Sequence, residues 1–161
     1  MSTGSGASFE IRPAGEADRL PLARLFATVA EERDGIAAEP PVDVERWAAR
    51  WEVDQTFVAV SGEEIVGELH LVRTPFGFAE IAMMVAAPWR GRGVGSALIG
   101  EAIRLARERG LHKLTLGVFP HNEAAIALYR KFGFVEEGRR PKHIRRANGE
   151  LWDLIEMGLL L

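Results

Sequence analysis

Residues 90–95 read Arg-Gly-Arg-Gly-Val-Gly, between an apolar run, Ile81 to Ala87, and an amphipathic run, Leu98 to Ala106. This order predicts a strand, a glycine-rich turn and a helix. Glycines let several backbone N–H groups point into one concavity, and the N-terminus of the helix adds partial positive charge there. Two arginines add full charge. The stretch is therefore suited to binding a polyphosphate.

Length and composition indicate one globular domain. The chain has 161 residues, of which 47% are hydrophobic and 27% are charged, so it can bury a core. Residues 1–7 are small and polar, and we expect a disordered leader there, followed by a single domain over residues 8–161. The chain has no cysteine, which excludes a disulfide framework, a thiolate metal site and a cysteine nucleophile.

Net charge and hydropathy limit the classes of binding partner that we expect. The net charge is −3, which argues against a general nucleic-acid-binding protein. No apolar run approaches the roughly 20 residues that a membrane span needs. We therefore expect a cytoplasmic protein without nucleic-acid or membrane partners and without a bound metal.

The chain before the glycine turn divides into helical and strand patterns. Phe9–Arg12 predicts a short strand, and residues 16–33 and 42–52 predict two helices. Three strands follow, joined by short turns that indicate an antiparallel meander: residues 56–60, 65–72 and 79–85. In the second of them, alternation places Ile65, Leu69 and Leu71 on one face and Glu68 and His70 on the other.

After the turn, the pattern predicts a helix over 96–109 closed by Gly110, and a strand over 113–119. Asn122 is a good N-cap for a helix that ends at Phe132. Strands are expected over 134–137 and 151–160, with a basic loop at 139–146 between them. The fold class is α+β: a mixed, mostly antiparallel twisted sheet of about seven strands, flanked by about four helices.

Four interpretations of the glycine turn compete. A P-loop needs Gly-Lys-Ser/Thr, but Gly95 is followed by Ser96-Ala97, so this interpretation fails. A dinucleotide fingerprint needs an acidic residue at the end of the next strand, and that strand runs into Phe119-Pro120-His121 instead. A glycine-rich loop without a ligand is the third interpretation, and the presence of two arginines in the turn argues against it.

The fourth interpretation is a resemblance. Arg90-x-x-Gly93-x-Gly95, after Pro88-Trp89, resembles the pyrophosphate-binding motif of the GNAT superfamily of acetyl-CoA-dependent N-acetyltransferases. Pro120-His121-Asn122 with Leu128-Tyr129 and Phe132-Gly133-Phe134 is similar to a downstream segment of the same family. The resemblance covers residues 8 to 161. The ending, 146–157, looks like that of amino-acid and phosphinothricin-type N-acetyltransferases.

The resemblance implies a binding site for acetyl-CoA as cosubstrate. Backbone amides of the turn would hold its pyrophosphate, and Arg90 and Arg92 could contact phosphates. The strand before the turn would part from its neighbour at a bulge, so that Met83 and Val85 pair with the pantetheine arm, which Asn122 also binds. The cofactor-binding residues are then Met83, Val85, Arg90, Gly91, Arg92, Gly93, Val94, Gly95, Ser96 and Asn122.

The catalytic residues expected from the resemblance are Tyr129 and Glu80. Tyr129, the only tyrosine, lies two helical turns after Asn122 and would protonate the leaving thiolate. The attacking amine must lose a proton, and a carboxylate or imidazole could take it. Glu80, in an otherwise apolar strand, is the first choice. Glu68, His70 and His121 are alternatives.

These residues predict direct acetyl transfer to a primary amine in a ternary complex, without an acyl-enzyme. The expected acceptor is a small amine, such as an amino acid. Trp47, Trp51, Phe76 and Phe78 suggest an apolar wall of its pocket, and the basic run at 139–146 could attract a carboxylate. A protein N-terminal or lysine acetyltransferase and a non-catalytic acyl-CoA-binding module stay open as alternatives. By analogy with the family, a homodimer is also compatible.

Overall fold

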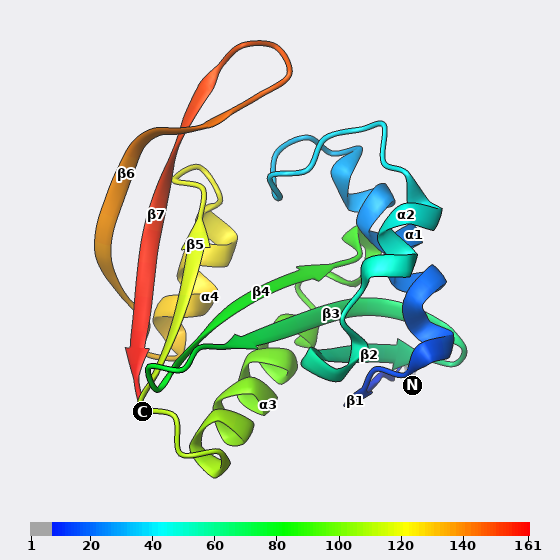
Figure 1. Ribbon diagram of the computed structural model, residues 1–161, viewed down its shortest axis with the longest axis horizontal. Coiled ribbons are helices and arrows are strands. Elements are labelled where there is room, and N and C mark those ends of the chain that lie inside the picture. Colours follow the sequence, from blue (N-terminus) through cyan, green and yellow to red (C-terminus); the bar gives the residue numbers. More distant parts are fainter. Residues whose placement is uncertain (1–7) are drawn as a thin grey trace, which may run out of the picture.

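The computed structural model describes residues 8–161, which form one twisted, seven-stranded sheet with helices on both faces (Figure 1). The expected leader, residues 1–7, lies outside the described part. The order across the sheet is β1-β2-β3-β4-β5-β7-β6. The strands are β1 (Glu10–Pro13), β2 (Thr56–Ser61), β3 (Glu64–Arg73), β4 (Phe78–Val85), β5 (Lys113–Val118), β6 (Val135–Arg145) and β7 (Leu151–Leu160).

Within residues 8–161, four α-helices and three 3₁₀ turns connect the strands. The helices are α1 (Arg19–Ala30), α2 (Val44–Arg50), α3 (Val94–Glu108) and α4 (Glu123–Lys131), and the turns are η1 (Glu16–Asp18), η2 (Val53–Gln55) and η3 (Ala87–Trp89). The expected mixed, mostly antiparallel fold is confirmed. No helix within residues 8–161 is both long and apolar enough to cross a membrane.

The junction between β4 and β5 divides the sheet. From β1 to β4 the strands form the expected antiparallel meander, and β5, β7 and β6 are antiparallel as well. β4 and β5 run parallel, but they pair only from Phe78–Lys113 to Glu80–Thr115. Beyond these pairs the two strands diverge, which leaves the C-terminal half of β4 with one free edge (Figure 1).

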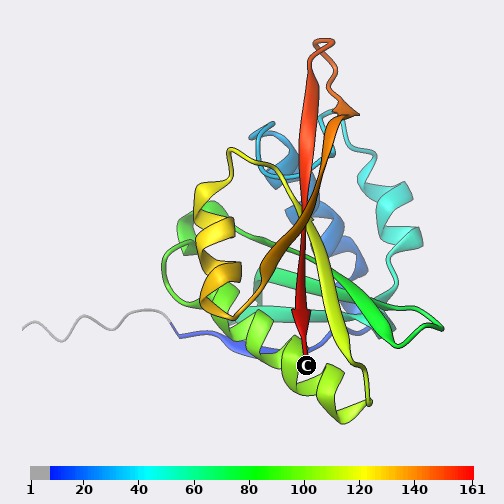
Figure 2. The ribbon, with the colours of Figure 1, turned by 90° about the vertical axis from the view of Figure 1, so that its left-hand side faces the viewer.

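Helices lie on both faces of the sheet (Figure 2), and a hydrophobic core lies between the sheet and the helices on each face. The larger core packs α3 and α4 against the sheet and includes Leu98, Leu114 and Tyr129. The smaller core packs α1 against β2, β3 and β4 through Leu22, Val29 and other apolar side chains. Because buried apolar area is the main favourable term in folding, these cores fix the sheet that positions the site.

A β-bulge in β3 places one residue on the face opposite to the predicted one. Ala59 pairs with Gly67 and Val60 with Ile65, so Val66 is an extra residue in β3. The extra residue reverses the alternation, and Ile65 packs in the core with α1 while Leu69 and Leu71 pack in the core with α3. The expectation that Ile65 shares a face with Leu69 and Leu71 was therefore wrong. Glu68 and His70 lie on the opposite face to Leu69, as predicted.

The basic run at 139–146 was expected to be a loop, and this expectation was wrong. Residues 139–145 belong to β6, which pairs with β7 in a long hairpin. Acidic residues of β7 compensate its charges: Arg139 pairs with Asp153 and Arg140 with Glu156, each at 2.8 Å. Cross-strand ion pairs of this kind make a strongly charged segment compatible with a strand.

Candidate active site

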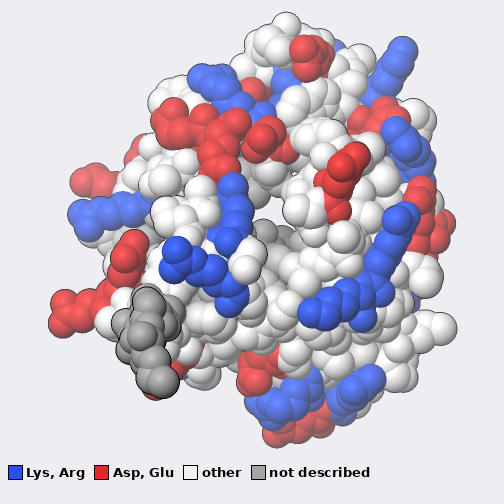
Figure 3. Space-filling view, turned by 180° about the vertical axis from the view of Figure 1, so that it is seen from behind, with Lys and Arg blue, Asp and Glu red and all other residues white. Residues whose placement is uncertain are grey.

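A cavity of about 1070 Å³ opens where β4 and β5 diverge. Figure 3 shows the molecule hollowed near its middle, with Lys and Arg side chains beside the opening. The cavity is lined from both faces of the sheet. Ser96, Leu128 and Tyr129 contribute from α3 and α4, and Phe26, Trp47 and Trp51 contribute from the α1–α2 side. A molecule bound there would pass between the two strands.

The glycine turn forms one end of the cavity. Gly91 and Gly93 have φ angles of +73° and +86°, and a Cβ atom at either would meet nothing within 4 Å. Gly93 is the N-cap of α3 without a side-chain cap, so the amides of Val94, Gly95 and Ser96 have no intrahelical partner. The turn is a concavity of free amides at the positive end of a 15-residue helix, which suits a diphosphate.

The free edge of β4 carries the backbone groups predicted at Met83 and Val85. The Ala86 N–H donates to the Val66 carbonyl of β3 at 2.8 Å. Neighbouring residues of a strand point their backbone groups to opposite edges, so the N–H groups of Met83 and Val85 face the divergence from β5. The expected parting of the strands is present, but the expected bulge there is not: the β3–β4 register is regular from Arg73–Ala79 to Gly67–Val85.

The two arginines of the turn are engaged elsewhere. The Arg90 guanidinium donates to the Glu32 carboxylate at 2.5 and 2.8 Å and to the Val85 carbonyl at 3.0 Å. The guanidinium of Arg92 lies over the Trp89 ring, 5.3 Å from its centroid. Arg90 still lines the cavity together with Gly91 and residues 93–96, but its guanidinium is occupied by Glu32 and Val85.

Asn122 and Tyr129 lie on the α4 wall of the cavity. The Asn122 side chain accepts a hydrogen bond from the Ala125 N–H at 3.3 Å, which confirms the predicted N-cap. Tyr129 is 7% exposed and packs beside Phe134. Burial raises the pKa of its hydroxyl to about 12, so the group stays protonated at neutral pH and is available as a proton donor.

The candidate bases occupy different environments. Glu80 is exposed and is not among the residues that line the cavity, although it shares a face of β4 with Ala82 and Met84. Glu68 and His70 do line it. Glu68 is 3% exposed, and its Oε2 lies 3.2 Å from His70 Nδ1. Burial raises the pKa of Glu68, and the hydrogen bond from His70 opposes that shift in part.

On the α1–α2 side, the cavity has an aromatic wall that differs in part from the one predicted for the acceptor pocket. Phe26 packs against Trp47 and Trp51 with ring centroids 4.7 and 5.9 Å away. Phe76 is 76% exposed, and neither Phe76 nor Phe78 lines the cavity. Phe26, which lies within the predicted helix over residues 16–33, is an additional residue of this wall.

Arg146 closes this side by holding the loop between α1 and α2. It is 3% exposed and donates to the carbonyls of Arg33 and Ala37 at 3.0 and 2.9 Å. Its guanidinium stacks over Trp152, 4.1 Å from the ring centroid. His121 supports the same loop through a 2.7 Å hydrogen bond from Nε2 to the Asp34 carbonyl. No sequence signal separated Arg146 from its exposed neighbours.

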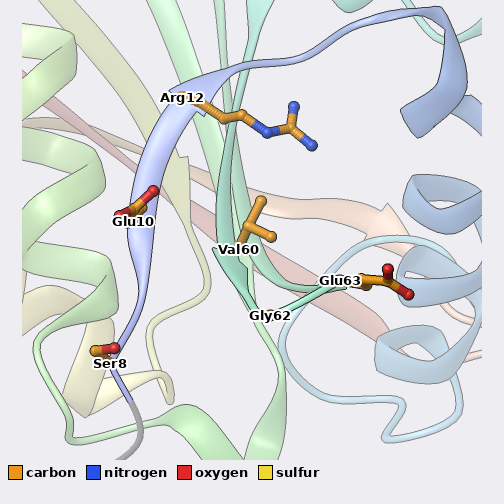
Figure 4. Close-up of a pocket in the computed structure, with 6 residues that line it drawn as sticks. All are labelled: Ser8, Glu10, Arg12, Val60, Gly62 and Glu63. Carbon is orange, nitrogen blue, oxygen red and sulfur yellow. The ribbon is translucent and has the colours of Figure 1, made fainter.

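A second hollow lies at the far edge of the sheet, between β1 and the β2–β3 turn (Figure 4). It is lined by Ser8, Glu10, Arg12, Val60, Gly62 and Glu63. Arg12 is already paired with Asp18 at 2.7 Å. Within residues 8–161, no group of three or more His, Asp or Glu side chains is placed to hold a metal ion. The cavity at β4 and β5 therefore remains the candidate site.

Comparison with known proteins agrees with this geometry. The model of the acetyltransferase (GNAT) family matches residues 22–134, more than half of the chain. The chain belongs to the acetyltransferase (GNAT) family. As a GNAT protein it is an N-acetyltransferase with acetyl-CoA as its acyl donor, and the resemblance predicted from residues 90–95 and 120–134 is confirmed.

Relatives of this GNAT protein include amino-acid N-acetyltransferases. It is 34% identical to the L-amino acid N-acetyltransferase of Escherichia coli, over 70% of this chain and 72% of that protein. It is 28% identical to the L-methionine sulfoximine/L-methionine sulfone acetyltransferase of Pseudomonas paraeruginosa, over 96% of this chain and 95% of that protein. A Bacillus subtilis relative provisionally named a phosphinothricin acetyltransferase matches over 48% of its own length.

Solved structures share the fold. The ribosomal-protein-alanine N-acetyltransferase of Brucella melitensis superposes with a TM-score of 0.82 and 33% identity, covering 94% of this chain and 99% of that one. The related acceptors therefore include both small molecules and a protein.

Proposed function

We propose that residues 8–161 act as one catalytic domain that transfers acetyl from acetyl-CoA directly to the primary amine of a small amino acid or amino-acid analogue. The observation that carries the proposal is a cavity that joins a concavity of free backbone amides on one face of the sheet to an aromatic pocket on the other. Donor and acceptor can then be bound together, as a ternary-complex mechanism requires.

The donor end has features that fit coenzyme A. The amides from Gly91 to Ser96 would hold the diphosphate, and the open space at Gly91 and Gly93 leaves room for its close approach. The free edge of β4 at Met83 and Val85 would pair with the amide-rich pantetheine arm, together with Asn122. The Val85 N–H would then stabilise the oxyanion that forms when the amine attacks.

The proton donor in this proposal is Tyr129. Tyr129 lines the cavity from α4, two turns beyond Asn122, and the raised pKa of its hydroxyl keeps it protonated. A neutral donor beside the leaving sulfur can give up its proton when the carbon–sulfur bond breaks. Glu80, which is exposed and lies outside the cavity lining, is not part of the proposal.

An amino acid as the acceptor is supported by one cationic side chain of the cavity that has no ion-pair partner. Arg90 is paired with Glu32, while the hydrogen bonds of His70 and His121 go to Glu68 and the Asp34 carbonyl. In the described part of the chain, Arg50 is the cationic residue of the cavity lining without an ion pair or side-chain hydrogen bond. A carboxylate on the acceptor would pair with it. The amino-acid acetyltransferases among the relatives agree with such an acceptor.

The test is thiol release from acetyl-CoA with a panel of amines. L-amino acids, methionine sulfoximine and phosphinothricin form one arm, the corresponding decarboxylated amines a second, and peptides with free N-termini a third. We expect turnover to be highest in the first arm. Turnover confined to peptides would instead favour the protein-acetylating alternative, which the Brucella melitensis structure supports. Binding of acetyl-CoA without turnover in any arm would favour a binding module.

A further inference from the structure

Glu68 is a buried carboxyl group on the acceptor face of β3. It is 3% exposed and lies between Val58 of β2 and Met84 of β4, two residues of the core that packs against α1. Burying a carboxyl in such a place is unfavourable unless it is compensated, and an apolar side chain of similar size would pack there without that penalty. A buried carboxyl group at this position therefore indicates a functional role.

Within residues 8–161, the side chain of Glu68 has one hydrogen-bond partner, the imidazole of His70. The two side chains lie on the same face of β3, two residues apart, with His70 Nδ1 3.2 Å from Glu68 Oε2. When Glu68 is ionised it can only accept, so in the neutral imidazole His70 Nδ1 carries the proton and Nε2 keeps its lone pair. The His70 side chain is 39% exposed and lines the cavity, whereas the Glu68 side chain is 4% exposed.

The position of this pair in the sheet matches the two-faced cavity. His70 lies opposite Ala82 and Glu68 opposite Met84, on the strand whose free edge carries the Met83 and Val85 amides. The pair faces α1 and α2, where the aromatic pocket lies, while Tyr129 belongs to the core on the α3–α4 face. One proton-accepting group and one proton-donating group thus reach the cavity from opposite faces.

We propose that His70 is the general base that deprotonates the acceptor amine, and that Glu68 is the positioning residue that holds its tautomer and orientation. The proposal rests on the proposed function. His70 Nε2 removes a proton from the ammonium group and releases it to solvent. The neutral nitrogen then forms the bond to the carbonyl carbon, Nε2 takes the second proton from that nitrogen, and the carbon–sulfur bond breaks.

The proton balance closes over the turnover. Two protons leave the nitrogen of an ammonium acceptor, and one proton reaches the sulfur from the Tyr129 hydroxyl. Tyr129 regains its proton through solvent in the cavity, so the net products are the acetamide, the free thiol and one proton in solution. A base is needed because an alkylammonium group has a pKa of about 10.4 and is almost fully protonated at neutral pH.

The charged groups around His70 fix the sign of the pH dependence. Burial lowers the pKa of His70, but the hydrogen bond and charge of Glu68, with a smaller contribution from Glu52, outweigh burial and raise it. The other charged groups on this side of the sheet lie on neighbouring elements. Arg50 lines the cavity from α2 and Asp34 from the α1–α2 loop, and Glu80 lies on the same face of β4 as Ala82. The active form is neutral His70, so kcat should rise with pH through this raised pKa.

The decisive experiment compares His70→Asn, Glu68→Gln and the exposed control His143→Asn in profiles of kcat against pH, with both substrates saturating. We expect His70→Asn to lower kcat about 100-fold or more and to lose the acidic limb of the profile, with unchanged binding of acetyl-CoA. Glu68→Gln removes the charge that raises the His70 pKa, so the acidic limb should move to lower pH. His143→Asn should match the wild type.

Two further measurements keep the outcome decisive. His70→Ala should regain activity when imidazole is added, whereas a purely structural loss should not respond, and thermal melting with acetyl-CoA titration shows which variants fold. The proposal is overturned if folded His70→Asn keeps kcat within about 3-fold and the same acidic limb, since a lost general base costs more. If the wild type binds acetyl-CoA but acetylates no amine, the proposed function itself has failed.

Discussion

The two ends of the cavity, which we assign to acetyl-CoA (the donor end) and to the amine (the acceptor end), differ in composition. The donor end consists of backbone: the amides of the 91–96 turn, the N-terminus of α3 and the free edge of β4. The acceptor end consists of side chains from three separate segments: α1 and α2, the loop between them, and the β6–β7 hairpin that holds this loop through Arg146. Besides Asn122 and Tyr129 on the α4 wall, the residues of the first end whose identity matters are its glycines.

This difference indicates which end sets specificity. Backbone amides present the same surface whatever the neighbouring side chains are, so they suit a donor that is the same in every reaction. Side chains can change without altering the sheet, so they suit an acceptor that differs between relatives, as the amino-acid and ribosomal-protein acetyltransferases do. Substitutions in the glycine turn should therefore weaken the binding of acetyl-CoA, while those at the acceptor end should change which amine is used.

The largest effect is expected from Gly93→Val at the donor end. The φ angle of +86° disfavours a β-branched residue, and the added side chain would fill the open space in front of the free amides. The Kd for acetyl-CoA, measured by calorimetry, should rise at least about 100-fold, or about 2.7 kcal/mol. Gly62→Val is the matched control, because Gly62 also has a positive φ and open space, but lies in the β2–β3 turn. Equal loss in both variants would contradict a local role for the turn.

Tyr129→Phe should separate chemistry from binding at the same end. The ring remains to pack beside Phe134, and only the hydroxyl is lost. We expect kcat to fall about 100- to 10,000-fold, as for other general acids, with the Kd for acetyl-CoA within experimental error of the wild type. In the wild type, kcat should show no alkaline loss from this group below its pKa of about 12. A kcat that survives the substitution would remove Tyr129 from the mechanism.

At the acceptor end, Arg146→Met should loosen the pocket without disturbing the donor site. The substitution leaves the carbonyls of Arg33 and Ala37 without their donor. We expect a loss of about 2 to 3 kcal/mol in the free energy of unfolding, together with a raised KM for the amine. Denaturant titration and steady-state kinetics measure the two effects. An amine KM equal to that of the wild type would show that the loop does not shape the pocket.

The smallest effect is expected from Arg50→Ala. If Arg50 pairs with the carboxylate of the acceptor, its loss should raise the KM for an L-amino acid about 3- to 10-fold, the range of a partly exposed charged contact. The KM for the decarboxylated amine should stay constant, which makes that amine the internal control. An equal change for both acceptors would mean that Arg50 supports the pocket in general.

The features that the sequence predicted well depend on local rules. The glycine turn, the Asn122 cap and the strand–turn–helix order around residues 81–106 each follow from residues within one or two turns of the chain. The proposed donor site is made largely of such features, and most of the residues predicted for it line the cavity, while their binding role stays a prediction. The family resemblance then supplied the identity of the phosphate-bearing molecule.

The features that the sequence did not reveal depend on partners far along the chain. Arg90 is paired with Glu32, 58 residues away, and Arg146 binds carbonyls more than 100 residues away. Ile65 changes face because Val66 is an extra residue opposite β2, which no pattern within β3 reveals. Glu80 and Glu68 look alike in sequence, as single acids in apolar strands, and only packing distinguishes the exposed one from the buried one.

The most direct test of the account is a crystal structure of the protein with coenzyme A. The account predicts that the diphosphate accepts hydrogen bonds from the amides of residues 91–96, at about 2.9 Å, with the pantetheine arm along the free edge of β4 between Met83 and Val85. Coenzyme A bound elsewhere, or a diphosphate held by arginine side chains with these amides unengaged, would contradict it.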